Sequence, residues 1–390
     1  MGLAVGSAPI VFIGGAIVLV RVVAERWPKR VLDALVYERT IYPTKTVVGD
    51  EVEVRLSIWN RSRLPIAWAN ADETISPGLR VTSTGGEVAI AGPMRPYEKV
   101  TRRLLVKPLA RGVHEVGPVR IGVGEHFGTQ HPYVDVPSLP ATITARPLMV
   151  PVVGRTQHSS SLAQLRARRS LYTDPTLFAG TRPFQTGDPV RSIHWRASAR
   201  EGTLQAKRFE PALSRQQVLV LDVQTLEGPY WMLGSDERLF EDLCIAALSF
   251  ARTLITEDAA CGFAAAGFSH TTQRFAYLPP RADRAQIERI GDALARLTPE
   301  SSAPLTNLLG WLPTRVAKGT TLAILSGRGP KSSAPVVKRL QQSGFPVQFV
   351  LFGQGASAES LTDARRVGIP AWASRVQSEG GRPQSVMINA

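Results

Sequence analysis

The sequence predicts a doubly wound α/β domain, preceded by an antiparallel β-sandwich domain and by one N-terminal transmembrane helix. Three observations carry this prediction. A charge-free apolar run opens the chain, short alternating segments follow it, and apolar segments then alternate with amphipathic helical ones. With 390 residues, the chain is long enough to build two separate hydrophobic cores.

The N-terminal run from Gly2 to Val20 contains no charged side chain, and about 20 apolar residues are enough to span a bilayer as a helix. We therefore expect a transmembrane helix over 2–24; a buried core helix is the alternative. No basic region precedes the run, unlike in a cleaved secretory signal. Four basic residues follow it within ten positions, namely Arg21, Arg26, Lys29 and Arg30. The positive-inside rule then predicts a single-pass protein of the cell membrane, with its N-terminus outside and its soluble domains in the cytoplasm.

The second segment, 44–147, alternates polar and apolar residues, as in "EVEVRLSIW" at 51–59, with Gly, Pro and Asn between the alternating stretches. No helical period persists through it. Short strands at this spacing predict an antiparallel β-sandwich. We expect this domain to display surfaces rather than perform chemistry.

The third segment, 148–214, is predicted as a basic connector. Between Arg155 and Arg208 it holds ten Lys or Arg and three Asp or Glu. This excess of seven positive charges is half of the net charge of +14. Such local basicity fits nucleic acid, an anionic surface or an acidic partner.

The fourth segment, 215–376, is predicted as the α/β domain. The runs "QVLVLDV" (217–223), "TTLAILSG" (320–327) and "FPVQFVLFG" (345–353) have the continuous apolar character of strands buried on both faces, and helical patterns lie between them. Residues 377–390 are expected to be a tail. Ligands of such sheets bind at the carboxyl ends of the strands, which here means Asp222 and the stretch Ser326–Arg328.

Composition excludes some classes of protein. The chain is 44% apolar and 20% charged, as globular proteins are, so disorder is not expected. Two cysteines, Cys244 and Cys261, are too few for a disulfide framework and match no metal-ligand spacing. We expect both thiols to be buried, in a reducing compartment.

The segment "RPFQTGDPVRSIHWRASAREGTLQAKRFEP" at 182–211 holds the candidate functional residues. Asp188, His194 and Ser198 are residue types of a catalytic triad, but no nucleophile elbow presents the serine. No phosphate-binding loop is present either, so we predict neither an enzyme nor a cofactor. An anion or nucleic-acid site stays open, because the arginines offer donors and Trp195 is able to stack on a base.

A structural interpretation of the same segment is preferred. Asp188 pairs with an arginine, and Gly187 allows a tight turn before it. Trp195 serves as a buried apolar anchor whose indole N–H finds a partner. The segment then clamps the β-domain onto the first strand of the α/β domain, and the remaining arginines face an acidic partner.

The segment closely resembles the signature of the bacterial family known as domain of unknown function 58. "WNRSRLPIAW", "RGVHEVGPVRI" and "YLPPRAD" resemble that family too. Ala199, Leu204 and Glu210 belong to the matching positions, and the candidate interaction or structural residues are Arg182, Gly187, Asp188, Arg191, His194, Trp195, Arg196, Ser198, Arg200 and Lys207. The resemblance implies a membrane-anchored protein with a von Willebrand factor A-like α/β domain, linked to MoxR-type AAA+ ATPases.

The metal site of such domains, Asp-x-Ser-x-Ser with a Thr and an Asp from further loops, is degenerate here. Gln224 and Leu226 stand in place of the two serines, and Ser326 stands near the position of the distant Asp. Asp222 and Thr306 are the remaining oxygen donors, and Arg328 adds a positive charge. Since Mg²⁺ requires near-octahedral oxygen ligation, we predict no metal and no cofactor; pairing of Asp222 with an arginine, or a helix cap, is the preferred alternative.

These observations predict a non-enzymatic, membrane-anchored adaptor or scaffold. From the resemblance, its partner is a MoxR-type AAA+ ATPase, in the assembly or maturation of protein or cell-envelope complexes. The alternative is a nucleic-acid or anionic-ligand binding protein that uses the basic segment 155–208, although nucleic acid is the less favoured partner. A hydrolase is a weaker third possibility.

Overall fold

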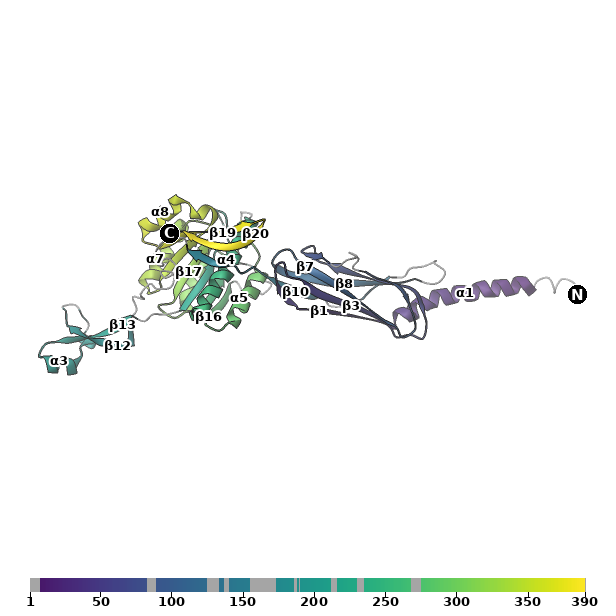
Figure 1. Ribbon diagram of the computed structural model, residues 1–390, viewed down its shortest axis with the longest axis horizontal. Helices are drawn as coiled ribbons and strands as arrows, with labels where there is room; N and C mark the ends of the chain where they lie inside the picture. The colour runs from purple at the N-terminus through teal and green to yellow at the C-terminus, as the bar shows by residue number, and fades with distance from the viewer. Residues whose placement is uncertain are drawn as a thin grey trace. The chain divides into compact units, whose positions relative to one another are not determined.

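The computed structural model describes residues 8–82, 89–124, 133–136, 140–154, 173–185, 188, 190–211, 216–229, 235–267 and 275–389. The chain divides into two compact units, Met1–Arg146 and Pro147–Ala390 (Figure 1). Each unit contains its own buried hydrophobic cluster.

Helix α1 (Ala8–Leu32) opens the first unit. Its apolar side chains are exposed at Val11, Phe12, Ile13, Ile17, Val18 and Leu19. At the other end of the helix, Val31 is fully buried and belongs to the core of the β-domain. Among the helices of the described residues, none meets the combined length and apolarity that a membrane crossing requires.

The β-domain of the first unit consists of two sheets that share one core. One sheet has the order β1-β3-β7-β5, and the other has the order β2-β10-β8-β4-β6 with β9 beside β8. The described strands are β1 (Leu35–Tyr42), β2 (Lys45–Val47), β3 (Val52–Asn60), β4 (Ile66–Ile75), β5 (Leu79–Val81), β6 (Ala89–Met94), β7 (Lys99–Pro108), β8 (Gly112–Gly124), β9 (Tyr133–Val136) and β10 (Ala141–Arg146).

The strand pattern of β3 follows its sequence closely. Val52, Val54, Leu56 and Ile58 are buried at alternate positions, because successive side chains of a strand point to opposite faces. The domain nevertheless begins nine residues earlier than residue 44, with β1 at Leu35.

Strand β1 has a mixed inward face. Ile41 is buried in the core, and Leu35 and Tyr37 pack against that core, whereas Arg39 places a charge on the same side. The hydroxyl of Tyr37 and the guanidinium of Arg39 both donate to the carboxylate of Glu73, a buried residue of β4. Burial is the main cause that raises the pKa of Tyr37, and the hydrogen bond to Glu73 adds to it. The buried pair of Arg39 and Glu73 thus interrupts the apolar alternation that marks a strand.

The second unit is built on a mixed sheet that has, among the described residues, eight strands in the order β11-β20-β19-β18-β17-β14-β15-β16. From β15 to β19 neighbouring strands are parallel. Strand β16 runs antiparallel to β15, and β20 runs antiparallel to β19 but parallel to β11. The strands are β11 (Val152–Gly154), β14 (Gln216–Leu221), β15 (Ala260–Ala265), β16 (Ala276–Arg281), β17 (Thr321–Ser326), β18 (Val347–Leu351), β19 (Ala371–Glu379) and β20 (Arg382–Asn389).

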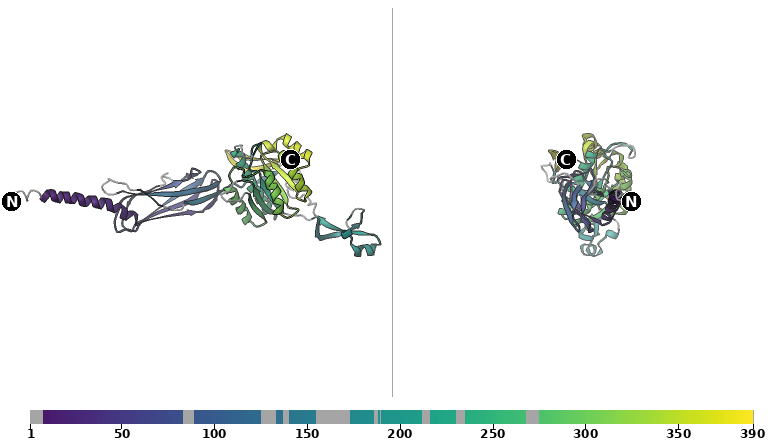
Figure 2. Two further views of the ribbon diagram at one scale, coloured as in Figure 1. Left: turned by 180° about the vertical axis from the view of Figure 1, so that it is seen from behind. Right: turned by 90° about the vertical axis from the view of Figure 1, so that its right-hand side faces the viewer.

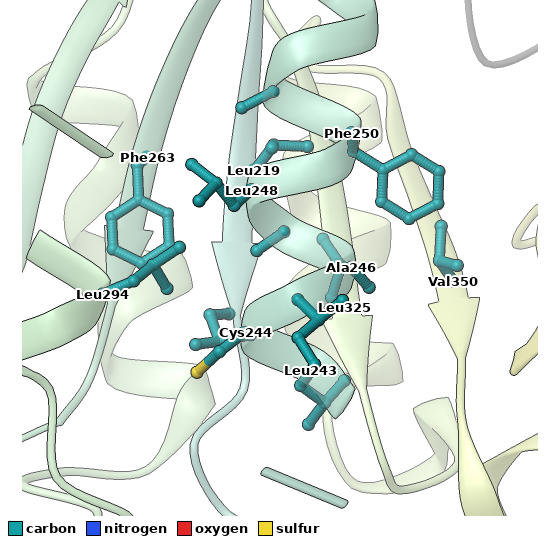
Figure 3. Close-up of a cluster of buried hydrophobic side chains, with 14 of the residues drawn as sticks. Leu219, Leu243, Cys244, Ala246, Leu248, Phe250, Phe263, Leu294, Leu325 and Val350 are labelled. Carbon is teal, nitrogen blue, oxygen red and sulfur yellow. The ribbon is translucent and has the colours of Figure 1, made fainter. Parts of the chain in front are cut away.

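Helices cover both faces of this sheet (Figure 2). On one face, Leu219 and Leu221 of β14 join the cluster formed with α4 (Glu237–Thr256) and α5 (Ala285–Arg296). Figure 3 shows Leu243, Leu248 and Phe250 of α4 in this cluster. On the other face, the cluster includes residues of α6 (Leu305–Trp311) and α7 (Ala334–Gln342), and α8 (Ala358–Val367) packs against it. Because both faces are covered, the strands of 215–376 carry the continuous apolar runs seen in the sequence.

The expected tail at 377–390 is part of the sheet. Strands β19 and β20 form an antiparallel pair, and β20 also pairs with β11. In β20, Val386 and Ile388 are fully buried, and Ser385, Met387 and Asn389 beside them are half-buried. The short alternation "SVMIN" near the end of the chain was too brief to predict a strand without its two pairing partners.

Candidate functional site

The segment singled out in the sequence folds as a small module of its own, which we call the signature hairpin: β12 (Thr173–Pro183), the short 3-10 turn Val190–Ser192, α3 (Trp195–Glu201) and β13 (Gln205–Pro211). Strands β12 and β13 pair antiparallel and form a sheet of their own (Figure 1). Buried Ile193 bridges to Ala206, which is fully buried, so the turn before α3 packs onto β13. The predicted clamp between the two domains stays a prediction.

Asp188 is held in a bidentate ion pair, as its sequence context predicts. Its two carboxylate oxygens accept from the Arg182 guanidinium at 2.6 and 2.7 Å. The backbone N–H of Gln185 donates to the same carboxylate at 2.9 Å. The hydrogen bond from Arg182 and then that from Gln185 hold the pKa of Asp188 below its usual value. Asp188 therefore ties β12 to the loop that follows it.

His194 and Ser198 hold α3 in place. His194 is the N-cap of α3, and its Nδ1 accepts from the backbone N–H of Ala197 at 3.0 Å. The hydroxyl of Ser198 donates to the carbonyl of His194 at 3.1 Å and accepts from the N–H of Gln205 at 2.8 Å. Gly202 ends the helix with φ of +66°, a left-handed conformation that favours glycine. His194 and Ser198 thus act on the backbone of the hairpin, and no contact with Asp188 joins them into a triad among the described residues.

Trp195 differs from the prediction. Its side chain is 66% exposed rather than buried as an apolar anchor. Two further apolar residues of the hairpin, Val190 at 69% and Leu204 at 50%, are also exposed. The hairpin is too thin to bury a large indole, because its interior is already filled by Ile193, Gln205 and Ala206.

The basic residues of the signature flank these apolar side chains. Arg191, Arg196 and Arg200 are exposed, whereas Lys207 is half-buried. Gly187 lies outside the described residues. Sequence reasoning found the arginines and named Leu204 as a position that matches the family signature, but it missed Val190, whose only signal was an apolar side chain in a strongly polar stretch.

At the carboxyl edge of the large sheet, Asp222 binds a cation supplied by the chain itself. The Arg328 guanidinium contacts the Asp222 carboxylate at 2.9 Å, and the Ser326 hydroxyl donates to it at 2.7 Å. Both partners of the ion pair are buried, with side-chain exposures of 8% for Arg328 and 4% for Asp222. Burial raises the pKa of Asp222, and Arg328 and Ser326 act against that shift. The structure thus brings Asp222 and Ser326 together around Arg328.

The other positions of the degenerate metal site take different roles. The side-chain amide of Gln224 donates to the carbonyls of Leu226 and Gly228 at 3.1 and 2.6 Å, so it shapes its own loop. Leu226 is half-buried. Thr306 lies half-buried in the first turn of α6. Within the described residues, no group of three or more His, Cys, Asp or Glu side chains is arranged to hold a metal ion.

Close packing seals this edge of the sheet. The N–H of Gly355 donates to the carbonyl of Gly327 at 2.8 Å. A Cβ at position 355 would lie 2.7 Å from that carbonyl oxygen, so only glycine allows the two loops to approach. The geometry around Asp222 is therefore that of a structural ion pair beside two closely packed loops.

A surface cleft of the second unit lies between the turn Pro330–Ser332 and α8. Lys331, Asp363 and Arg366 are its charged lining residues. Arg366 donates to Asp363 at 3.0 Å, so these two charges compensate each other. The cleft brings together none of the residues singled out in the sequence.

Comparison with solved structures finds only weak likeness. A fragment of native Escherichia coli alpha-2-macroglobulin is 22% identical, over 29% of this chain and 17% of that chain, with a TM-score of 0.22. Salmonella alpha-2-macroglobulin reacted with methylamine is 20% identical, over 29% of this chain and 7% of that chain, with a TM-score of 0.21. The secreted serine protease VesC from Vibrio cholerae is 11% identical, over 32% of this chain and 25% of that chain, with a TM-score of 0.19. The matches thus cover a quarter of those chains or less, and they carry no argument about function.

No curated protein matches the sequence. One family model does, and it is described as "Protein of unknown function DUF58". The match covers residues 180–327, which run from the end of β12 through the signature hairpin, β14, α4 and β17 to the Asp222–Ser326 edge. The signature and the Asp222–Ser326 edge both lie inside the matched range, so residues 180–327 of the chain match the DUF58 family of proteins of unknown function.

Proposed function

We propose that the protein is a non-enzymatic, membrane-anchored adaptor or scaffold, with a von Willebrand factor A-like domain as its α/β body. Its proposed partner is a MoxR-type AAA+ ATPase, and its proposed role lies in the assembly or maturation of protein or cell-envelope complexes. The observation that carries the proposal is the exposed tryptophan of the signature hairpin beside exposed arginines.

The exposure of Trp195 supports a binding role. Burying an exposed indole releases a large apolar surface from water, and Trp and Arg are the residue types that dominate binding energy at protein interfaces. In the hairpin, the backbone is fixed by internal hydrogen bonds of His194 and Ser198. The surface is thus presented on a pre-organised frame, which lowers the entropy cost of association.

His194, Ser198 and Asp188, the residue types of a catalytic triad, each form structural hydrogen bonds, which supports a role other than catalysis. Nδ1 of His194 already accepts a backbone hydrogen bond, so it is not placed to take a proton from a hydroxyl. The Ser198 hydroxyl is occupied by two backbone groups. Asp188 is committed to Arg182.

The proposed anchor is α1 together with the residues before it. The exposed apolar residues Val11–Ile13 and Ile17–Leu19 fit the hydrocarbon of a bilayer. Arg21, Arg26, Lys29 and Arg30 follow in the sequence, which supports a cytoplasmic place for the two units.

Capture of the full chain from detergent-solubilised membranes tests the proposed partner. We expect MoxR-type ATPases of the same genome to be retained by the tagged wild-type chain, and to be retained less by Leu204→Ala. Leu109→Ala is the matched control, because Leu109 is an equally exposed leucine of the first unit, at 47% against 50%. Failure to retain any such ATPase would refute the partner.

Protease accessibility tests the proposed anchor and topology. A protease added to intact cells is expected to spare both units, and carbonate washing is expected to leave the chain in the membrane pellet. Recovery in the soluble fraction would refute the anchor. Digestion of the β-domain from outside would refute the orientation.

A further inference from the structure

We infer that one face of the signature hairpin binds an acidic segment of a partner protein that also carries an apolar side chain. This face, which we call the tryptophan–arginine face, consists of the exposed residues Trp195, Arg196, Ala199 and Arg200 of α3. The inference rests on the proposed adaptor function and specifies the chemistry of the segment that the adaptor recognises.

Helix geometry places the charged and apolar groups of α3 side by side. Trp195 and Ala199 are four residues apart, and so are Arg196 and Arg200, so each pair forms a row along the helix. All four side chains are exposed. Ala197 and Ser198 are half-buried on the other side, where Ser198 bonds to β13. The outer side of α3 therefore offers an apolar row next to a row of guanidinium groups.

The charge of this face calls for an anionic partner. Arg196 and Arg200 form no ion pair with any residue that the structure describes, and as like charges four residues apart they repel each other. The nearby Asp188 is already paired with Arg182. Two carboxylates bound across the arginine row would relieve this repulsion.

The spacing of the arginines fits carboxylates on a polypeptide. Residues four apart on a helix are separated by about 6 Å along the axis. Carboxylates at positions i and i+4 of a helix, or at i and i+2 of a strand, have nearly the same spacing. A partner segment with two such acidic residues is thus able to contact both guanidinium groups at once, in charge-assisted hydrogen bonds.

The apolar part of the face favours a protein over nucleic acid or lipid. Exposed Val190 and Leu204 add aliphatic groups to the surface of the same hairpin, whereas nucleic-acid sites combine basic residues with aromatic stacking platforms. Binding in a bilayer surface takes an amphipathic helix with one long apolar face, and α3 has seven residues with an apolar row of two.

The test uses the full chain in detergent micelles and a fluorescent synthetic peptide of glutamate and leucine as the probe. We expect saturable binding that weakens as salt is added. Trp195→Ala and the double variant Arg196→Gln/Arg200→Gln are each expected to weaken binding about tenfold or more, since Trp and Arg are typical hot-spot residues. Glu201→Gln is expected to strengthen it, because a like charge is removed.

Matched controls separate the face from general effects. Arg281→Gln/Arg284→Gln removes two exposed arginines elsewhere in the same unit and is expected to leave peptide binding unchanged. A lysine–leucine peptide of reversed charge is expected not to bind. Thermal melts of all variants establish that they fold, which is expected because every substituted side chain is exposed.

Three outcomes would overturn the inference. Peptide binding that is the same in wild type, Trp195→Ala and the arginine double variant would show that the face is not the site. Tighter binding of oligothymidylate, lost in the same variants, would assign the face to nucleic acid. Tighter binding of phosphatidylglycerol vesicles, lost in these variants, would assign it to lipid.

The peptide test and the capture test fail independently. If the peptide binds as expected but no MoxR-type ATPase is captured, the inference about the tryptophan–arginine face is supported and the proposed partner is refuted. If the ATPase is captured equally by wild type and by Trp195→Ala, the adaptor role is supported and the inference about this face is refuted.

Discussion

The guanidinium of Arg328 contacts the buried carboxylate of Asp222 with two of its nitrogens, Nη2 at 2.9 Å and Nε at 3.2 Å from Oδ2. The two residues lie at the carboxyl ends of neighbouring parallel strands, β17 and β14. A positive charge of the chain thus occupies the position at this edge where a bound cation would meet Asp222. The contact also explains why an acidic residue is tolerated in a buried position.

Arg328→Ala is expected to destabilise the α/β unit by about 3–5 kcal/mol, because it leaves the Asp222 carboxylate buried without its partner. The double variant Asp222→Ala/Arg328→Ala should lose less than the sum of the two single variants, since residues in one ion pair are coupled. Urea denaturation of all four forms measures this cycle. Additive losses would mean that the pair does not act as a unit.

Titration with Mg²⁺ or Mn²⁺ is expected to show no saturable micromolar binding. Arg328 and Ser326 occupy the Asp222 oxygens, and Gln224 uses its side chain within its own loop. Calorimetry together with thermal melts in the presence of each ion checks this. Saturable binding that is abolished by Asp222→Ala would contradict the prediction.

Asp188→Asn is expected to loosen the signature hairpin, because the ion pair to Arg182 is lost. The pKa of Asp188 is lowered in the folded chain, so its contribution to stability is present above the pKa of the unfolded carboxyl group. That contribution disappears as pH falls through the lowered pKa. Limited proteolysis should therefore cut the wild-type hairpin faster in acid, while Asp188→Asn should be cut fast at both pH values. Equal resistance of the two proteins at neutral pH would contradict this account.

His194→Asn is expected to preserve the hairpin, because Asn is a good N-cap. His194→Ala removes the acceptor for the Ala197 N–H and should cost about 1 kcal/mol of helix stability. Proteolysis of the hairpin and peptide binding measure the two variants. If His194 served as a general base, Asn would abolish function as completely as Ala; equal loss in both variants would thus argue against the capping role.

Asp242→Asn is expected to stabilise the protein at pH 7. Burial within α4 raises the pKa of Asp242 to about 6, against the attraction of Arg238. The folded chain then holds this proton more tightly than the unfolded chain does, so stability is highest below the unfolded pKa and falls as pH rises towards about 6. A gain of about 1 kcal/mol is expected, since water still reaches the side chain. Denaturation at pH 4 and pH 7 checks it; no difference between the variant and the wild type at pH 7 would refute it.

Predictions from the sequence succeeded where a pattern is local. The alternation of β3 and the continuous apolar run of β14 identify strands because each residue's burial follows from its position in the strand. The pair between Asp188 and Arg182 joins residues only six positions apart, so the turn between them brings the two together.

Predictions failed where burial depends on distant partners. Trp195 was expected to be buried because a large indole usually is, but the hairpin offers no room inside. Strand β20 forms only because β19 and β11 pair with it on its two sides. Strand β1 carries Arg39 on its inward face, and this charge is tolerated because the carboxylate of Glu73 in β4 accepts a hydrogen bond from it.

By itself, the sequence determined the order of elements along the chain, the family signature and the concentration of basic charge. Only the tertiary structure decided that Arg328 pairs with Asp222 across 106 positions of the chain, and that Trp195 faces solvent. The physical reason is the same in both cases. Periodicity and charge are properties of neighbouring residues, whereas exposure and ion pairing depend on which distant segments pack against a side chain and which leave it in water.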